Sequence, residues 1–564
     1  MRTIAGVLGI ALVAVPVASA SAQTAPEGVS PGELLRQFDE QPEPRVDTLP
    51  PRPDAPEQAV PEGTEAIRFE LAAVELEGVT VYEDGVLAEA WSDLIGTEVG
   101  FGDLVGVAND LTARYRRDGY ILSQVVVPAQ EVEDGVVRLR AVEGYVDRVV
   151  FEGEIAGPRR HLAPLAAAIE AERPLTVATL ERNLLLIGDL PGVNVQSVLE
   201  PSPDQFGAAD LTIVLAHDNA EGFVQLDNHG SEFTGPLTAA AGASFYSIFG
   251  GWEQIDLTVA FNPEDPEELV YGSGRVTIPI GPGDWGTRLE LEGSVLTSDP
   301  SLPDDVFGFD SPGRGFESAI RVVQPIIRSR DQNLTARAGF RLSEEMTDID
   351  EFDLKTEDRV RVVEGGLTYD VVDPLLGVNL VDVSMHQGLD IFTASRPSVV
   401  SRQGSGASAE FTYIRGTISR LQPVGGGVSF FGSLEWQYAF DPLLPSERFS
   451  VGGRRIGRGF PPGSVVGDHG LAAKAEVRYG NVVDRQFLES YQAYGFFDFG
   501  KAWDVDSTTD DENDIASVGL GVRWNVTSDV AVNPEIARRI DGSGPDDSID
   551  DSDVRLLFTV TARF

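Results

Sequence analysis

The chain ends in Asp553-Val-Arg-Leu-Leu-Phe-Thr-Val-Thr-Ala-Arg-Phe564, and this stretch decides the fold. Every second residue from Val554 to Phe564 is apolar, and the residues between them are Arg or Thr, apart from Leu557. A period of two is typical of a β-strand with one apolar and one polar face. When such a strand closes on an aromatic residue in a chain with an export signal, it indicates a transmembrane β-barrel with lipid outside and water inside.

The N-terminus carries the pattern of a secretory signal peptide, which we expect at residues 1–22. Arg2 supplies the positive end, residues 4–17 form a short apolar core, and the small residues at 18–22 offer cleavage sites. After this segment no apolar run reaches the roughly 18 residues that a membrane helix needs. Export without a later spanning helix leaves the periplasm, secretion or a membrane barrel as the destination.

The composition excludes several classes of function. The 564 residues include 90 acidic and 43 basic side chains, and the net charge of −47 argues against nucleic-acid binding, because phosphates require clustered Lys and Arg. The acidity fits a solvated, salt-tolerant surface, or acidic outer loops that bind cations or repel wrong partners. There is no cysteine, and the five histidines are scattered without the spacing of a metal pair, so we expect no metal and no cofactor.

Residues 218–564 carry the pattern of the barrel. Segments of ten to fifteen residues alternate apolar and polar positions, and clusters of Gly, Asp, Pro and Ser separate them. Leu289 and Leu291, for example, alternate with Arg288 and Glu290. Such charges are costly in a dry core but are expected in a water-filled lumen. About sixteen segments can be laid out, an even number as single-chain bacterial barrels require.

Two small α+β units are predicted before the barrel, at residues 67–144 and 145–217. Both show the order strand, helix, strand, strand, starting in the first unit with a strand pattern at residues 67–79. The second unit has an additional helix, which begins at the cap residue Thr176.

A leader precedes these units at residues 23–66. It begins with a short helical pattern at residues 31–41, where Leu34, Leu35 and Phe38 share one side, and continues with seven prolines between positions 42 and 61. The segment is either a disordered leader or a helix on a semi-rigid tether. A tethered helix can occupy one place in one state and leave it in another.

The predicted loop 441–467 differs from the other connections between strands. Its stretch Ser450-Val-Gly-Gly-Arg-Arg-Ile-Gly-Arg-Gly-Phe-Pro-Pro-Gly463 has five glycines, two prolines and three arginines. The stretch fits a loop folded back into the lumen, where Arg458 would need a carboxylate partner because an unpaired buried charge is costly. It also fits a glycine-rich surface loop with a solvated arginine. The candidate partner is Asp498, which faces the lumen because its two Phe neighbours belong to the lipid-facing set.

These segments together resemble the outer-membrane transporters of two-partner secretion, the haemolysin secretion/activation protein family, within the superfamily of POTRA-bearing barrels. The two α+β units resemble its two POTRA domains. Arg458-Gly459-Phe460 resembles the Arg-Gly-aromatic motif of the family's lumenal loop, and Asp498-Phe-Gly500 resembles the wall motif that receives the arginine. One departure is Gly457, where the family commonly has an aliphatic residue, and we expect this glycine to loosen the loop tip.

The resemblance covers nearly the whole mature chain and implies a function. It implies that the POTRA domains, in the periplasm, capture an unfolded exported partner, and that the barrel, in the lipid of the outer membrane, forms the pore. The partner is expected to be a large, β-rich exoprotein, the barrel a monomer, and the protein not an enzyme. The helix that carries Leu34, Leu35 and Phe38 resembles the family's pore-plugging helix.

Three other functions fit parts of the sequence. An outer-membrane protein assembly factor would share the motifs but usually carries more POTRA units. A passive porin would need neither POTRA units nor the loop with Arg458. A surface enzyme would need a catalytic set, and the sequence has no Ser elbow, metal cluster or isolated carboxylate pair that points to one.

Overall fold

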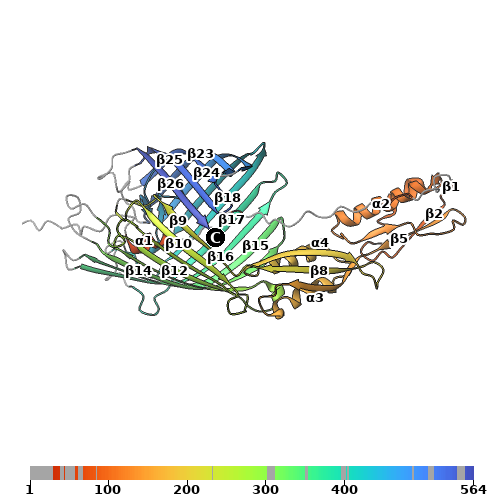
Figure 1. Cartoon of the computed structure of the whole chain (residues 1–564), viewed down its shortest axis with the longest axis horizontal. Coiled ribbons are helices and arrows are strands. Elements are labelled where there is room, and N and C mark those ends of the chain that lie inside the picture. Colours follow the sequence, from red (N-terminus) through yellow and green to blue (C-terminus); the bar gives the residue numbers. More distant parts are fainter. Residues whose placement is uncertain are drawn as a thin grey trace, which may run out of the picture.

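The molecule is elongated, with a wide barrel at one end, two small α+β units in a row, and helix α1 (Pro31–Arg36) inside the barrel (Figure 1). The predicted signal peptide and most of the predicted tether lie outside the residues that the structure describes. This computed structural model describes residues 30–38, 44, 58–60, 68–83, 85–231, 233–301, 311–349, 354–395, 402, 406–485, 488–505, 513–542 and 553–564.

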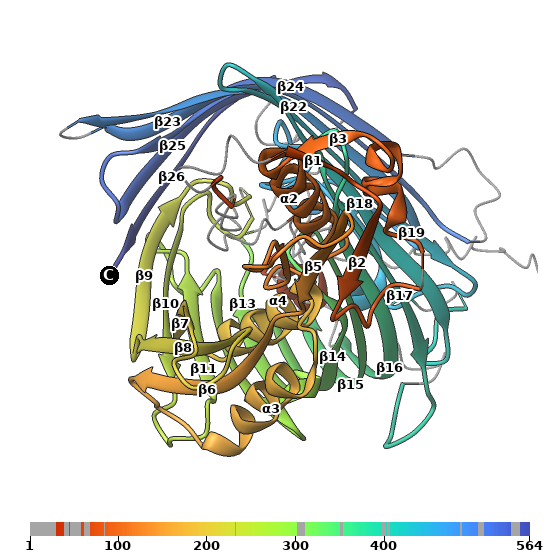
Figure 2. The same cartoon turned by 90° about the vertical axis from the view of Figure 1, so that its right-hand side faces the viewer.

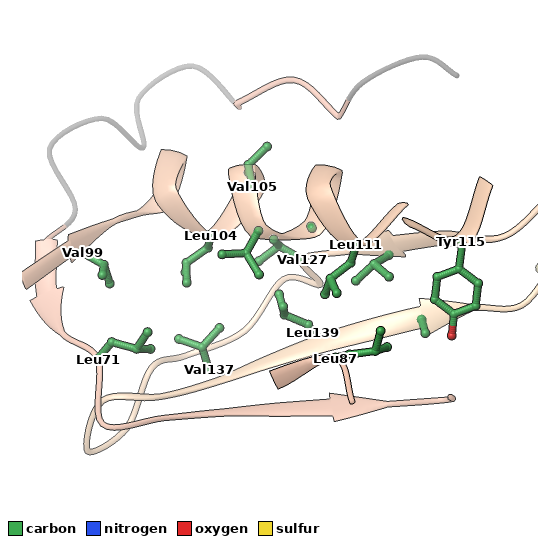
Figure 3. Packing of buried hydrophobic residues seen from close by; sticks show 14 residues of the cluster. Leu71, Leu87, Val99, Leu104, Val105, Leu111, Tyr115, Val127, Val137 and Leu139 are labelled. Carbon is green, nitrogen blue, oxygen red and sulfur yellow. The ribbon is translucent and has the colours of Figure 1, made fainter. Parts of the chain in front are cut away.

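The first unit lies farthest from the barrel and packs a helix on a small sheet. In Figure 3, Leu104 and Leu111 of helix α2 point towards Val137 and Leu139 of the sheet. The strand predicted at 67–79 is split into two strands of different sheets, because the chain turns after the first of them and buries Leu71. The elements of this unit are β1 (Arg68–Glu70), β2 (Ala73–Glu77), η1 (Ala88–Ala90), η2 (Ser92–Leu94), β3 (Glu98–Gly100), α2 (Phe101–Arg117), β4 (Gln124–Val126) and β5 (Val136–Val142).

The second unit has a three-stranded sheet in the order β6-β8-β7, which leaves β6 and β7 at the edges. Helix α3 packs beside β6 and helix α4 beside β7. Helix α4 begins at the predicted cap, since Thr176 Oγ1 accepts a hydrogen bond from the Thr179 N–H at 3.3 Å. Among the described residues, no helix is both long enough and apolar enough to span a membrane. The elements here are β6 (Tyr145–Gly153), η3 (Arg159–His161), α3 (Ala163–Ala171), α4 (Val177–Gly188), β7 (Val193–Pro201) and β8 (Ala208–His217).

Sixteen strands close into an antiparallel barrel, as the sequence pattern predicts. Strand β9 follows directly from β8, so the barrel end where β9 begins faces the α+β units (Figure 1). The resemblance described above would make this the periplasmic end. The strands are β9 (Ala220–Asp227), β10 (Thr238–Tyr246), β11 (Gln254–Phe261), β12 (Val270–Pro279), β13 (Arg288–Ser298), β14 (Gly313–Arg328), β15 (Gln332–Ile349), β16 (Leu354–Val372), β17 (Val378–Gly388), β18 (Thr412–Gly425), β19 (Val428–Ala439), β22 (His469–Arg485), β23 (Leu488–Trp503), β24 (Asn513–Asn525), β25 (Val530–Asp541) and β26 (Val554–Arg563).

The two faces of the barrel wall differ as the alternation predicts. On the outer face Leu556 is 72% exposed, as suits a side chain in contact with lipid. On the inner face, Glu292 accepts hydrogen bonds from Arg275 at 3.1 Å and from Arg321 at 2.5 Å, so charges pair across neighbouring strands. Leu557, the apolar exception on the polar face, is 4% exposed and packs in the lumen beside Phe496.

The barrel closes at a short seam between β26 and β9. Five residue pairs join these strands, from Thr559↔Asp227 to Arg563↔Phe223, and Phe564 adds two main-chain hydrogen bonds with Gly222, whereas β15 and β16 share eighteen pairs. The side chain of Asn228 extends the seam beyond β9. Its Nδ2 donates to the carbonyl oxygen of Leu556 at 2.8 Å, and its Oδ1 accepts from the N–H of Phe558 at 2.7 Å. An amide side chain thus takes the place of a strand backbone.

The second unit is attached to the turns at the barrel end that faces it. Trp252, in the turn between β10 and β11, is fully buried in the core of that unit, and its indole N–H donates to the carbonyl oxygen of Pro158 at 3.2 Å. Arg328, at the end of β14, makes two hydrogen bonds of 2.8 Å with Asp189 beside α4. These contacts fix the second unit under one side of the barrel (Figure 2).

Candidate functional site

The connection between β19 and β22 folds back into the barrel. It contains η6 (Pro445–Glu447) and the short strands β20 (Phe449–Val451) and β21 (Val465–Gly467), which pair with each other. Its apolar side chains pack on the inner wall of β22 to β24 in one buried cluster. The structure thus has a folded lumenal loop rather than a surface loop. The members of the cluster are Phe449, Val451, Ile456, Phe460, Val465, Ala472, Ala502 and Ile515.

Glycines allow the tight path of this loop. Gly457 has a φ of +87°, a backbone conformation that side chains disfavour, and a Cβ there would lie 2.9 Å from Ile515 Cδ1. Its N–H donates a hydrogen bond to Asp498 at 3.1 Å. The expectation that Gly457 loosens the loop tip is therefore wrong, because this glycine permits close packing and an additional hydrogen bond.

Arg458 and Asp498 form a buried, bidentate ion pair. The guanidinium Nε and Nη2 each donate to one carboxylate oxygen of Asp498 at 2.9 Å, and the Arg458 backbone N–H adds a bond of 3.1 Å. Arg458 is 4% exposed and Asp498 is fully buried. Two parallel charge-assisted bonds fix the orientation of the arginine as well as its position. The structure thus brings together the two residues that the sequence paired.

The arginine has further partners that the sequence analysis missed. Its Nη1 donates to Glu476 at 3.0 Å and to Glu535 at 3.2 Å, and its guanidinium lies 3.5 Å from the ring centroid of Phe496. Glu476 also pairs with Arg478 and Arg523. The alternation of apolar and polar residues places both glutamates in the lumen. Many other lumenal positions also carry charges, so the alternation alone could not identify these two as partners of Arg458.

The remaining motif residues make close contacts at the loop tip. The Gly459 N–H donates to Ser517 Oγ at 3.2 Å, and the Gly459 carbonyl accepts from Arg539 Nε at 2.9 Å. Phe460 is fully buried with the Arg539 guanidinium 4.9 Å from its ring centroid. Gly500 of β23 lets β20 pack closely against the wall, because a Cβ at this position would lie 2.4 Å from Val451 Cγ1.

Helix α1 occupies the lumen on the side opposite this wall motif. Ser30 caps its first turn, accepting a hydrogen bond from the Glu33 N–H at 3.3 Å, and Leu34 and Leu35 are buried against β11 to β13. The helix ends at Arg36 rather than at the predicted position 41. Just beyond it, the ring of Phe38 stacks on Tyr271 with centroids 4.0 Å apart. All three predicted plug residues therefore contact the barrel wall.

The helix and the loop also contact each other. Arg36 Nη1 donates to the carbonyl oxygen of Arg448 at 2.6 Å, and Arg36 Nη2 lies 3.6 Å from Glu447 Oε2. Glu447 is held from the other side by two hydrogen bonds from Arg341, at 2.7 and 2.8 Å, and by one from the hydroxyl of Tyr413. One buried carboxylate thus joins the helix, the loop and the barrel wall.

A closed sixteen-stranded barrel with α+β units at its periplasmic end, and with a loop held in the lumen by an arginine, defines a POTRA-bearing outer-membrane barrel. The family profile of the haemolysin secretion/activation proteins ShlB/FhaC/HecB matches residues 207–524, and the ShlB-type POTRA profile matches residues 69–144. The chain belongs to this haemolysin secretion/activation family.

Individual relatives agree with this assignment. The heme/hemopexin transporter protein HuxB of Haemophilus influenzae strain 86-028NP is 22% identical over 477 residues, 81% of each chain. The structure of CdiB from Escherichia coli superposes with a TM-score of 0.69 at 19% identity, covering 90% of this chain and 94% of the other. BamA from Haemophilus ducreyi lacking POTRA domains 1–3 matches less well, with a TM-score of 0.51 at 13% identity. The chain is an outer-membrane transporter of two-partner secretion, with its POTRA domains in the periplasm.

Proposed function

We propose that this transporter moves a large, β-rich exoprotein as an unfolded chain through the barrel lumen. The observation that carries the proposal is that the lumen holds a short helix and a folded loop, neither of which is a strand of the wall. Helix α1 is six residues long and precedes a proline-rich segment, and the loop is a connection between β19 and β22 that is held on the wall by side-chain contacts rather than by strand pairing with it.

Capture is proposed to begin at the POTRA domains. In the second domain β7 is an edge strand, and its residues 196–201 are all exposed. An edge strand offers unpaired N–H and C=O groups to an extended peptide, and such main-chain hydrogen bonds tolerate many sequences. This tolerance suits a substrate that slides past, because each segment must bind and then leave.

Transport requires the lumen to clear. We propose that α1 leaves its site while the loop shifts or partly withdraws, and that the exoprotein passes in an extended form. Folding outside the cell would bias the direction, since a folded segment cannot return. We propose neither an enzymatic step nor a cofactor, and one barrel per transporter.

The experiment is mass spectrometry of the culture supernatant, the cell surface and the outer membrane, from cells with and without this gene. Loss of one large exported protein, with other barrels unchanged, is the expected result and identifies the exoprotein. A general fall in outer-membrane barrels would instead indicate an assembly factor and overturn the proposal.

A further inference from the structure

Helix α1 packs on an apolar surface of the barrel wall at the outer end of the lumen. We call this surface the exit groove. It lies at the ends of strands β11 to β14 that point away from the POTRA domains, next to the connection between β11 and β12 (Figure 1). Any chain that crosses the barrel would pass this surface last. The exit groove consists of Ala260, Leu269, Tyr271, Leu296, Gly313 and Gly315.

The exit groove is apolar and closely shaped to its occupant. Phe38 lies flat on Tyr271, with an angle of 6° between the rings. A Cβ added at Gly315 would lie 2.7 Å from Leu35 Cδ1, and one at Gly313 would lie 2.5 Å from a side-chain carbon of the first helical residue, Pro31. The wall thus presents glycines where the occupant lies closest to it.

Four polar atoms around the exit groove lack a hydrogen-bond partner among the described residues. They belong to side chains that are at least nine-tenths buried, and the unpaired carboxylate oxygen points at α1, since a Cβ at Gly32 would lie 2.1 Å from it. As α1 is seated, none of its groups forms a hydrogen bond with these four atoms. The four atoms are the Oγ of Ser298, Ser311 and Ser343 and the Oε1 of Glu345.

An extended polypeptide would suit these atoms better than a helix does. Each residue of an extended chain carries a free N–H and a free C=O, and burying such groups without partners is costly. The serine hydroxyls can donate or accept, and the Glu345 carboxylate can accept from an N–H or from a Lys or Arg side chain. The apolar part of the groove would receive alternate side chains of the same segment.

We propose that the exit groove is a binding site for an extended, apolar segment of the exoprotein, and that α1 occupies this site in its absence. The proposal rests on the proposed function and adds a specific contact surface to it. Displacement is easy because a helix of six residues has little stability of its own, so only its contacts with the wall and loop must be replaced. A segment that binds the groove therefore both removes the plug and gains a path outward.

The test uses a full-length transporter that lacks residues 31–41 and is expressed with its exoprotein. Tyr271→Ala and Leu296→Ala are combined in this background, where no plug remains to be held. If the groove only seats the plug, secretion equals that of the plug-deleted parent. If the groove binds the exoprotein, the loss of two apolar contacts should lower secretion about tenfold. Phe431→Ala, on strand β19 of the other wall, is the matched control and should secrete like the parent.

A second measurement covers the case in which the double variant fails to insert. A photo-crosslinking amino acid at position 271 of the plug-deleted protein should capture the exoprotein during transport more strongly than the same amino acid at position 431. Equal crosslinking at both positions, or unchanged secretion by an inserted double variant, overturns the exit-groove proposal. Absence of any exoprotein secretion by the plug-deleted parent would count against the proposed function instead.

Discussion

Replacing Arg458 by alanine should detach the lumenal loop from the barrel wall. In this variant Glu476 still forms its ion pairs with Arg478 and Arg523. Asp498, which is fully buried, loses the two hydrogen bonds that it accepts from the Arg458 guanidinium. Removing one partner of a buried ion pair costs about 3–5 kcal/mol, because the other charge is left uncompensated. Since each 1.4 kcal/mol is a factor of ten, the equilibrium between the bound and the released loop should shift by about 10²–10⁴-fold.

The assay measures exoprotein in the supernatant, together with the heat-modifiable migration of the barrel on gels. We expect Arg458→Ala to insert normally and to secrete poorly. Arg454→Ala is the matched control in the same loop, because Arg454 has a 58% exposed side chain and a single 3.8 Å contact with Asp227, which is worth about 0–1 kcal/mol. Normal secretion by the Arg458 variant, or equal losses in both variants, would refute the reasoning.

Three other perturbations test the remaining parts of the structure. Deletion of residues 31–41 should raise ion conductance in planar bilayers without abolishing secretion, and unchanged conductance would contradict the plug role. Trp252→Ala should remove about 3–5 kcal/mol of packing between the barrel and the second POTRA domain and lower secretion, whereas Trp285→Ala, at a 57% exposed tryptophan of a neighbouring turn, should not. Asn228→Ala leaves two backbone groups at the seam without their partner, at a cost of about 1–3 kcal/mol. The barrel should then unfold at a lower temperature in gel-shift experiments, and an unchanged midpoint would show that Asn228 does not hold the seam.

The barrel could be predicted from the sequence because its rule is local. A period of two, repeated over many segments, fixes which side chains face lipid, and an even strand count is the rule for single-chain bacterial barrels. The strand predicted at 67–79 was wrong in detail, because the turn that buries Leu71 depends on contacts with the rest of the first unit. The brevity of the β9–β26 seam, and the use of Asn228 to extend it, depend on the register of strands more than 300 residues apart.

The site was predictable where a motif marks it. Arg458 and Asp498 stand in distinctive glycine- and phenylalanine-rich surroundings, and the need to pair a buried charge links them. Glu476 and Glu535 have no such surroundings, and the lumen holds many similar charges. The contact of Arg36 with Arg448 joins residues 412 positions apart, and no local pattern encodes it.

The attachment of the second POTRA domain has a mechanical consequence. Its contacts lie at the periplasmic ends of β10, β11 and β14, and α1 rests near the opposite ends of the same part of the wall. Tension on a polypeptide held by this domain would therefore act first on the strands that also contact α1. Pulling on the second POTRA domain and releasing α1 would thus act on the same group of neighbouring strands in the closed wall.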